Sequence, residues 1–600
     1  MSKPARLALY AAARYLDSAS ERDLDLRIPF DVYFQDPLVA EADPLFGFDE
    51  DFHVRWEPGI SDGPTSARFA IVDYNGDTGH LAKPAKWDED NDRFLDTDGN
   101  PLDKENTGPL QFHQVNVWAV LQRALAFFEE GQGLGRPIAF GFNGNRLIVV
   151  PHAGYGQNAF YDRESKSLQF YYFDRDGKRI QTCLSTDIIN HEFGHAVLDG
   201  VRPLLFESSL VQSGAFHEFL GDLTAILIAL RNNRFRGLLA ETTGGDLAGA
   251  DHLAHIAEQF GSAVQEKPYL RTARNPLKMS DVADADGPHQ VSQVLTGAMF
   301  DLLLAFSNHY IQVRGQTAKQ AFWNAIQRMQ RTAIQPLDLL PPVDVTFKDY
   351  ALAVLRAEEL SNPTDPHGYL ELMLEAFHNR EILDEADLDA LREPRYLYDR
   401  PHFDVFHDVD DLSRSPAAAY RFLDDNRNAL LIPAHQDVVV AGLYDAHKLT
   451  RQGGRQPRQV ILEYVWRETV VLEGQRFGEY EGEWTEVLCG GTLVFDEHGN
   501  QLWWTRKPGT EGGEGWKWDQ EKRAGRTRRE VFLDDLARRI ASGQIGAALG
   551  SNKGLLATQV PPMVVRREGG GLKFQLAPHL NLSGENNEGY EGGRRWEVSS

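Results

Sequence analysis

The 600-residue chain contains only two cysteines, Cys183 and Cys489, which excludes a fold held together by a framework of disulfides. It also lacks any run of 18 apolar residues, so we expect no membrane-spanning helix. Positive charge is scarce, because 62 lysines and arginines stand against 88 aspartates and glutamates, and the formal net charge is −26. A chain of this charge binds nucleic-acid backbones and anionic membranes poorly, and we expect neither as a partner.

The N-terminus lacks a convincing signal peptide. Lys3 and Arg6 precede an apolar stretch that covers only residues 7–13, and Arg14 ends it at once. A stretch of this length is at the lower limit for a secretory signal, while its apolar residues also lie at helical spacing. We therefore interpret it as an amphipathic helix, with a cleaved signal as the alternative. The expected location is cytoplasmic, with non-classical export left open.

Composition and hydrophobic periodicity change several times along the chain. The beginning is rich in proline and acidic residues, short strand patterns follow with one helical pattern over 111–130, and apolar residues then recur at helical spacing. Strand-like alternation returns over 428–506, followed by an amphipathic helical pattern at 528–543. We predict four units: an acidic N-terminal extension (1–65), a β-rich lobe (66–186), a helical lobe (187–390) and a β-rich C-terminal domain (400–600).

The helical lobe contains seven stretches with helical periodicity, and Asp187 is a candidate N-cap of the first. The predicted helices are 188–200, 214–232, 251–265, 290–312, 316–331, 346–360 and 368–380.

Tryptophan is concentrated near the C-terminus, since seven of the eleven tryptophans lie in the last 200 residues. This pattern is typical of a β-rich core that uses aromatic side chains for packing. The alternative is an aromatic surface that recognises a partner.

The segment NHEFGHAVLDG (190–200) contains the most specific catalytic motif in the chain. His191 and His195 are four residues apart, so on a helix both imidazoles share one face and can bind a single metal ion. Glu192 follows the first histidine and can reach a water on that ion. A catalytic zinc site takes three protein ligands and leaves one position open, so a third ligand must come from elsewhere in the chain.

The next predicted helix supplies that ligand. Glu218 and Asp222 lie four residues apart within a strongly apolar stretch, where a pair of carboxylates is costly unless a positive group holds it. We therefore predict that Glu218 binds zinc and that Asp222 accepts a hydrogen bond from a ligating imidazole. The alternative is two solvated acids on a helix edge. His217 faces away at helical spacing and is interpreted as structural.

Together, HEFGH (191–195) and SGAFHEFLGD (213–222) resemble the signature of the thermolysin-like zinc metallopeptidases, or gluzincins. GYGQNAFYD (154–162) resembles the family's edge strand, KPYLRTARNP (267–276) resembles its substrate-contacting segment, and DADGPHQV (284–291) resembles an active-site loop. The resemblance covers about residues 66–385, with the motifs in the family's order. It implies an α+β, two-lobed metallopeptidase with a β-rich N-terminal lobe and a helical C-terminal lobe. The β-rich C-terminal domain would be an appended accessory domain.

The resemblance also implies roles for individual residues. Glu192 would act as the general base and then as the proton donor. His289 would donate a hydrogen bond to the oxyanion, oriented by Asp284. Five residues would contact the substrate: Asn158 and Ala159 through strand addition, Arg271 through a carbonyl, and Ile188 and Leu270 in an apolar pocket for the residue after the scissile bond.

Three departures from the family pattern affect these implications. Phe206 falls where the family has a tyrosine that assists the oxyanion, and phenylalanine has no hydroxyl to donate. The stretch LTAILIALRNN (223–233) has none of the carboxylates that the family's double calcium site needs. Calcium ligands are therefore considered only at Asp88, Asp90 and Asp187, with a solvated acidic turn as the alternative. The family is also usually secreted with an inhibitory propeptide, for which residues 1–65 are short.

These observations favour a zinc-dependent endopeptidase that acts on a peptide or protein substrate and prefers an apolar residue after the scissile bond. Three alternatives remain: a zinc hydrolase of another amide, a pseudoprotease that only binds peptides, and a C-terminal domain that recruits a recognition partner. Cys183 is interpreted as a small packed residue, because no histidine-paired signature surrounds it in the sequence.

Overall fold

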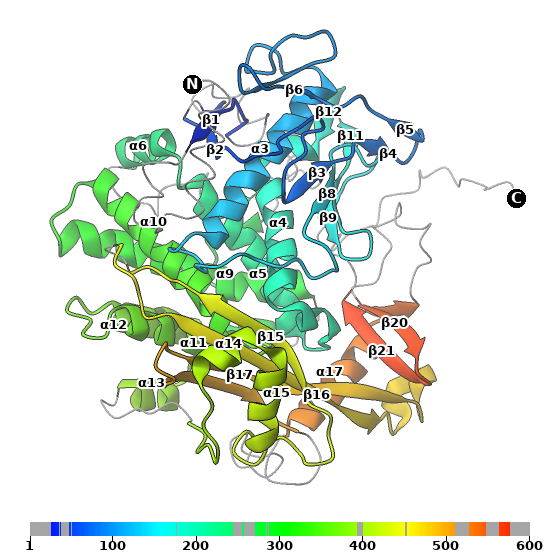
Figure 1. Ribbon diagram of the computed structural model, residues 1–600, viewed down its shortest axis with the longest axis vertical. Helices are drawn as coiled ribbons and strands as arrows, with labels where there is room; N and C mark the ends of the chain where they lie inside the picture. The colour runs from blue at the N-terminus through cyan, green and yellow to red at the C-terminus, as the bar shows by residue number, and fades with distance from the viewer. Residues whose placement is uncertain are drawn as a thin grey trace, which may run out of the picture.

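The computed structural model describes residues 26–34, 37, 47–49, 51–175, 177–243, 255–256, 271–283, 285, 287–392, 400–450, 453–509, 527–547 and 563–576. Helices and β-sheets are both abundant in these ranges, which confirms the predicted α+β class (Figure 1).

The N-terminal part packs a long helix, α3 (Leu110–Glu129), beside a four-stranded sheet. The sheet has the strand order β3-β8-β10-β9, in which β8 is parallel to both neighbours and β10 is antiparallel to β9. Strand β9 is therefore an edge strand. The strands of this sheet are β3 (Phe69–Ile71), β8 (Leu147–Val150), β9 (Ala159–Asp162) and β10 (Ser167–Phe170).

The described residues of this part also form four two-stranded antiparallel pairs. They are β1 (Arg27–Pro29) with β2 (His53–Arg55), β4 (Tyr74–Asn75) with β5 (His80–Leu81), β6 (Lys86–Asp88) with β7 (Arg93–Leu95), and β11 (Tyr172–Arg175) with β12 (Lys178–Gln181).

The middle of the chain is mainly helical. Its helices are α4 (Thr186–Val201), α5 (Val211–Ala229), α6 (Asn233–Thr242), α9 (Pro288–Gln312), α10 (Ala318–Ile334), α11 (Phe347–Ser361), α12 (Tyr369–Asn379) and α13 (Glu385–Arg392). Short 3-10 helices and strands connect them: η3 (Thr182–Leu184), η4 (Pro203–Glu207), η6 (Met279–Val282), η7 (Gln335–Leu339), β13 (His255–Ile256) and β14 (Arg271–Thr272).

Six of the seven helices predicted in this part are present, with boundaries shifted by a few residues. The predicted helix 251–265 is wrong at His255–Ile256, which pair with β14 as a strand, and the rest of it lies outside the described residues. The predicted N-cap is also wrong. The Ser185 hydroxyl caps α4 by accepting a hydrogen bond from the Ile188 amide at 3.3 Å, and Asp187 lies in the first turn. Serine suits this position because its side chain satisfies an unpaired amide.

The C-terminal part is built around one twisted sheet with the strand order β15-β16-β17-β21-β20-β19, and β18 pairs with β17. Its strands are β15 (Val439–Ala446), β16 (Gln459–Val471), β17 (Trp484–Phe495), β18 (Gln501–Lys507), β19 (Ile545–Ala547), β20 (Met563–Glu568) and β21 (Gly571–Leu576). The helices here are α14 (Val409–Arg414), α15 (Pro416–Asp425), η8 (Gln475–Tyr480) and α17 (Arg528–Ala541).

The described tryptophans of this part pack inside the molecule. Trp466, Trp503 and Trp504 are buried and belong to the main apolar core, and Trp484 is half-buried. Trp516, Trp518 and Trp596 lie outside the described residues. The four tryptophans that can be placed therefore support the packing interpretation over the aromatic surface.

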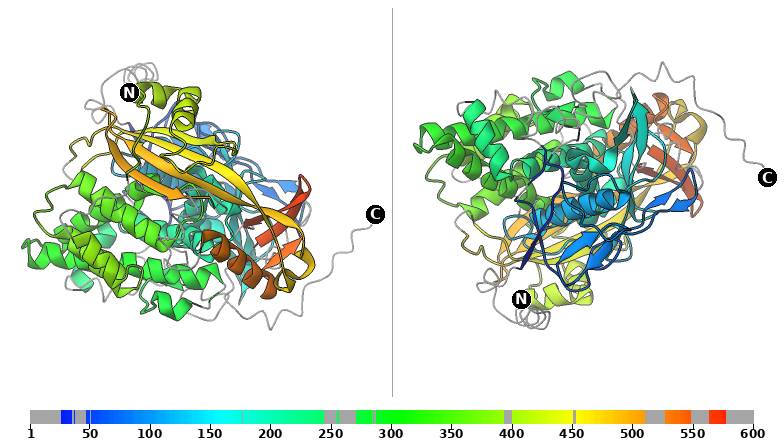
Figure 2. Two further views of the ribbon diagram at one scale, coloured as in Figure 1. Left: turned by 90° about the horizontal axis from the view of Figure 1, so that it is seen from below. Right: turned by 90° about the horizontal axis from the view of Figure 1, so that it is seen from above.

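The C-terminal sheet lies against the helical part (Figure 2). One contiguous apolar core contains residues from all four predicted units, among them Ile28, Trp118, Leu337 and Trp466. The predicted boundaries consequently do not separate independent cores among the described residues.

Buried ion pairs cross the same junction. Asp338 of η7 lies 2.7 Å from Arg136 and 2.9 Å from Lys448, and all three side chains are almost fully buried. Arg202, at the end of α4, pairs with Glu463 of β16. Removing one member of a buried pair leaves an uncompensated charge, which costs about 3–5 kcal/mol. Buried ion pairs as well as apolar packing therefore hold the C-terminal part against the rest of the molecule.

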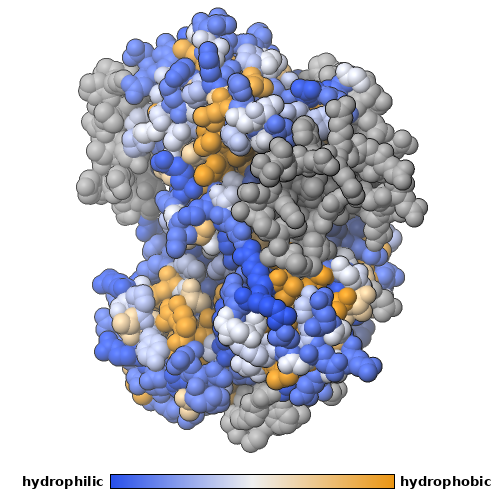
Figure 3. All heavy atoms as spheres, turned by 90° about the vertical axis from the view of Figure 1, so that its right-hand side faces the viewer, coloured by the Kyte–Doolittle hydropathy of each residue, from blue (hydrophilic) through white to orange (hydrophobic). Residues whose placement is uncertain are grey.

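Apolar surface is distributed in patches. Figure 3 shows, on the face that it draws, several separate apolar patches among hydrophilic side chains. Among the described helices, α9 alone is long and apolar enough by itself to cross a membrane, and 67% of its apolar window is buried inside the molecule. Helices α5 and α6 would meet the same criterion only as a pair bent by 83°. Burial of this kind is typical of a core helix.

Candidate active site

Helices α4 and α5 bring together three side chains that could hold a metal ion. His191 and His195 come from α4, Glu218 comes from α5, and all three are buried. The two Nε2 atoms are 3.2 Å apart. Glu218 Oε2 lies 3.7 Å from His191 Nε2, and Glu218 Oε1 lies 3.7 Å from His195 Nε2.

These separations fit a tetrahedral zinc site. With metal–ligand bonds of about 2.0–2.2 Å, the nitrogen and oxygen ligands of a tetrahedral zinc lie about 3.3–3.5 Å from one another. The three distances between Nε2 and carboxylate atoms fall within a few tenths of an ångström of that range. The donor set of two imidazoles and one carboxylate is also one that catalytic zinc uses.

Two glycines allow the helices to approach this closely. A Cβ atom on Gly194 would lie 2.8 Å from Cα of Gly221, and a Cβ atom on Gly221 would lie 2.7 Å from Nδ1 of His191. Both distances are shorter than real Cβ contacts, so neither position has room for a side chain. The glycine in HEFGH and the glycine in EFLGD thus set the spacing of the ligands.

Asp222 lies behind the first ligand. Its Oδ1 atom is 2.9 Å from His191 Nδ1, so the carboxylate accepts the outer N–H of the imidazole. The predicted hydrogen bond between Asp222 and one of the two imidazoles is thus present, at His191. It leaves His191 Nε2 with a lone pair that faces Glu218, which is the tautomer required for metal binding.

Glu192 and His289 complete the group around the triad. Glu192 lies between the two histidines on α4 and is buried. His289 is in the first turn of α9, directly after Pro288, although the sequence had placed it in a loop. Its Nδ1 atom lies 2.7 Å from Glu218 Oε2, and its side chain is 32% exposed while that of Glu218 is 0% exposed. Within this group, the site therefore opens to solvent on the side of His289.

The edge strand β9 is tied to the same helix. Tyr161 donates a hydrogen bond to Asp199 of α4 at 2.6 Å, and Arg163 donates to the same carboxylate through Nε at 2.9 Å. Burial raises the pKa of Asp199 even though Arg163 and Tyr161 oppose that shift. Sequence reasoning missed Asp199, although it lies four residues after His195 and so continues the spacing of the ligands.

Asn158 and Ala159 lie at the start of this strand. The Asn158 Oδ1 atom accepts a hydrogen bond from the Ala159 amide at 2.8 Å. Asn158 Nδ2 is buried and has no hydrogen-bond partner among the described residues. A buried amide in this state is costly, and a carbonyl group that reached it would satisfy it.

The structure describes only some of the other residues that were predicted to line the active site. Ile188 is buried on the first turn of α4. Arg271 lies in β14, where the backbone alone is described. Leu270 and Asp284 lie outside the described residues.

Phe206 and His217 form a layer behind His195. The His217 ring is 5.9 Å from the His195 ring and 4.7 Å from the Phe206 ring, measured between centroids. The guanidinium of Arg163 lies 4.6 Å from the centre of the Phe206 ring. His217 is fully buried and packs toward the second ligand, so the expectation that it faces away from the site is wrong.

The acids considered for calcium have other contacts. On the β6–β7 hairpin, Asp88 accepts hydrogen bonds from the Asp90 amide at 3.3 Å and the Asn91 side chain at 2.8 Å, and it pairs with Arg93. The Asn91 bond is the largest cause of the lowered pKa of Asp88. Asp187 is buried in α4. Among the described residues, neither group that could hold a metal contains any of these three acids.

Comparison of the chain with models of known protein families, and with curated proteins, finds no match. The proposed function therefore rests on the arrangement of side chains in the site.

Proposed function

We propose that this chain is a zinc-dependent endopeptidase with a thermolysin-like, two-lobed catalytic unit. The observation that carries the proposal is the buried triad of His191, His195 and Glu218, with donor atoms at the spacing of a tetrahedral zinc site. The Asp222 contact behind His191 adds the outer hydrogen bond that ligating histidines usually have.

The chemistry divides between the ion and the protein. A zinc ion at the triad would polarise a scissile carbonyl and lower the pKa of a bound water to about 7. Glu192 takes the proton of the attacking water and passes it to the leaving amine, a role suited to its place between the two ligands. His289, on the exposed side of the triad, donates a hydrogen bond to the developing oxyanion. Phe206 cannot assist, because it has no hydroxyl.

Substrate binding follows from the edge strand. Strand β9 ends the four-stranded sheet, so an extended peptide can add to it through main-chain hydrogen bonds. Asn158 Nδ2 is available for a substrate carbonyl at the start of this strand. Ile188 supplies part of an apolar pocket, and we expect an apolar residue after the scissile bond.

The decisive experiment changes one oxygen of Glu192 to nitrogen. Glu192→Gln keeps the shape of the side chain but removes the base, so cleavage of an unbiased peptide library should fall about 10²–10⁴-fold. The zinc content should stay near that of the wild type, because Glu192 is not a ligand. Glu241→Gln, on the exposed surface of α6, is the matched control and should leave both quantities unchanged.

Two results would contradict the proposal. A zinc-loaded wild type that binds library peptides without cleaving them would favour the peptide-binding pseudoprotease. A protein that spares peptides but hydrolyses other amides in a Glu192-dependent way would favour the zinc hydrolase.

A further inference from the structure

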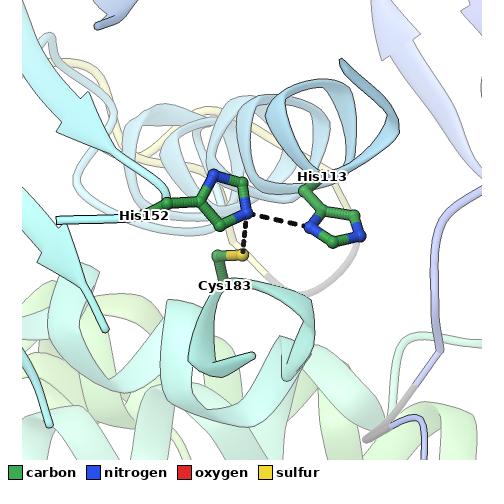
Figure 4. A group of neighbouring side chains, drawn as sticks. All are labelled: His113, His152 and Cys183. Carbon is green, nitrogen blue, oxygen red and sulfur yellow. Dashed lines mark hydrogen bonds between the residues drawn. The ribbon is translucent and has the colours of Figure 1, made fainter. Parts of the chain in front are cut away.

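A second group of metal-binding side chains lies away from the proposed catalytic triad. His113 comes from α3, His152 from the turn after β8 and Cys183 from η3 (Figure 4). All three are buried, and one donor atom from each lies within 4.8 Å of the others. Their sequence separations match no common metal-binding motif, which is why the sequence did not reveal the group.

The distances resemble those around a bound ion. His113 Nδ1 lies 2.9 Å from His152 Nε2, and Cys183 Sγ lies 3.8 Å from the same nitrogen. A tetrahedral ion with bonds of about 2.0–2.1 Å to nitrogen and about 2.3 Å to sulfur places two nitrogens about 3.3 Å apart and a nitrogen and a sulfur about 3.6 Å apart. The side chains therefore need to move only a few tenths of an ångström to hold such an ion.

Asp73 fixes the orientation of the central ring. Its carboxylate oxygens lie 2.8 and 3.0 Å from His152 Nδ1, and Gln114 donates a hydrogen bond to the same carboxylate at 2.8 Å. With the Nδ1 proton directed at Asp73, a neutral His152 presents the lone pair of Nε2 to His113 and Cys183. Ligating histidines in metalloproteins are commonly backed by a carboxylate in this way.

The outer nitrogen of His113 is also directed away from the group. The ring forms a hydrogen bond with the backbone of Thr107, and its second nitrogen points away from His152 and Cys183 (Figure 4). The inner nitrogen, His113 Nδ1, forms a hydrogen bond with His152 Nε2 at 2.9 Å. A bound ion would take the place of the proton in that bond, with both inner nitrogens as ligands.

We propose that His113 Nδ1, His152 Nε2 and Cys183 Sγ bind a second transition-metal ion of the zinc class, oriented by Asp73. A thiolate with two imidazoles favours zinc or copper over magnesium and calcium, which prefer oxygen ligands. The ion joins α3, the end of β8 and the 3-10 helix that leads into α4. It thereby cross-links the β-rich part to the start of α4, the helix that contains His191 and His195.

The same residues do not suit a cysteine nucleophile. The interpretation of Cys183 as a small packed residue is confirmed, because it is buried in the main apolar core. Tertiary structure also places it 3.8 Å from His152, which in turn contacts Asp73 at 2.8 Å. Nevertheless, the Cys183 side chain is 0% exposed and burial raises the pKa of the thiol. Reactive cysteines are partly exposed and have a lowered pKa.

Cobalt substitution tests the proposal, because a thiolate bound to cobalt gives a charge-transfer absorption and the proposed catalytic triad contains no sulfur. The full-length protein is stripped with a chelator and titrated with cobalt alone. We expect the absorption in the wild type and in His195→Ala, in which the first site is damaged. We expect it to be lost in Cys183→Ser, together with one bound ion per chain.

Cys489→Ser is the matched control. Cys489 is also buried, but its sulfur lies beside Arg528 rather than histidines, so the absorption should remain. Asp73→Asn keeps all three ligands but weakens the contact that orients His152. The affinity for cobalt, measured by titration of this absorption, should fall about 10–100-fold. If folded wild type shows no thiolate absorption at saturating cobalt, or Cys183→Ser retains it, the three side chains form only a hydrogen-bonded group and the proposal is wrong.

Discussion

Asp222 Oδ1 lies 2.9 Å from His191 Nδ1, while Nε2 of the same ring faces Glu218 at 3.7 Å. One helix, α5, therefore contacts both nitrogens of a histidine on α4. The carboxylate of Glu218 is in position to share a metal with the ring, and that of Asp222 determines which nitrogen carries the proton. This two-sided contact is what would allow the α4–α5 pair to hold a metal ion.

The first prediction concerns Asp222→Asn. An asparagine fits the same space but is a weaker acceptor for the His191 N–H, so zinc affinity should fall about 10–100-fold. Competition with a chelator of known affinity measures the change. At saturating zinc, peptide cleavage should largely recover, because the ligands themselves are intact. Unchanged zinc affinity in this variant would remove Asp222 from the metal site.

The second prediction concerns the close approach of the two helices. Gly221→Ala places a Cβ atom 2.7 Å from His191 Nδ1. The ring must move away from Asp222 and Glu218, so zinc binding and cleavage should both fall by at least about tenfold. The matched control is Gly214→Ala on the same helix, whose nearest new contact is Pro288 at 3.5 Å, an ordinary van der Waals distance. Equal zinc affinities in the two variants would show that the spacing at Gly221 is not critical.

The third prediction concerns His289. If this residue stabilises the oxyanion, His289→Gln should lower kcat about 10²–10³-fold with little change in zinc content. His289 Nδ1 already lies 2.7 Å from Glu218, the proposed third ligand, so the competing outcome is that His289 acts as a fourth ligand. In that case zinc content would fall with activity. His309→Gln, at the other end of α9, should affect neither measurement.

The fourth prediction is a pH dependence of stability that arises from Asp338. Burial raises its pKa, but Arg136 and Lys448 outweigh this effect and lower the pKa from 3.8 to about 2. A depressed pKa in the folded state stabilises the protein above the unfolded value. That contribution is then lost as the pH falls from about 4 through about 2.

Urea denaturation of the wild type and Asp338→Asn across this pH window tests the effect. At pH 7 the variant should lose about 3–5 kcal/mol of the free energy of unfolding, because two buried cations lose their partner. The difference between the two proteins should shrink below pH 4. Asp174→Asn, which disrupts an exposed pair with Arg179, is the control and should change stability little. A constant difference from pH 7 to pH 2 would contradict the assigned ionisation.

The fifth prediction concerns deletion of the predicted C-terminal domain, which we expect to unfold the rest of the chain. Deletion of residues 400–600 would leave Asp338 without Lys448 and Arg202 without Glu463, and it would expose apolar core. We expect the truncated chain to be insoluble or unfolded by circular dichroism. A folded truncation that still cleaves small peptides but cleaves protein substrates poorly would show instead that residues 400–600 form a separate recruiting domain.

Much of the proposed catalytic site could be anticipated from local sequence. His191, Glu192 and His195 lie on one predicted helix and Glu218 and Asp222 on the next, and the i, i+4 spacing already placed each pair on one face. The predicted helices of the middle segment are largely present for the same reason, since apolar periodicity reports burial directly. Local pattern did not decide between Ser185 and Asp187 as the cap of α4, since both residue types favour that position. It could not identify Asp199 as the partner of Tyr161, because that contact joins two distant elements.

What the sequence determined by itself is therefore whatever depends on neighbours within one or two helical turns: the helices, the ligand pairs and the absence of a disulfide framework. Tertiary structure alone decided the rest. It brings His113, His152 and Cys183 together from three separate elements, places His217 against His195, and buries Asp338 between Arg136 and Lys448. These contacts join residues tens to hundreds of positions apart. They form because buried polar and charged groups must find partners, wherever along the chain those partners lie.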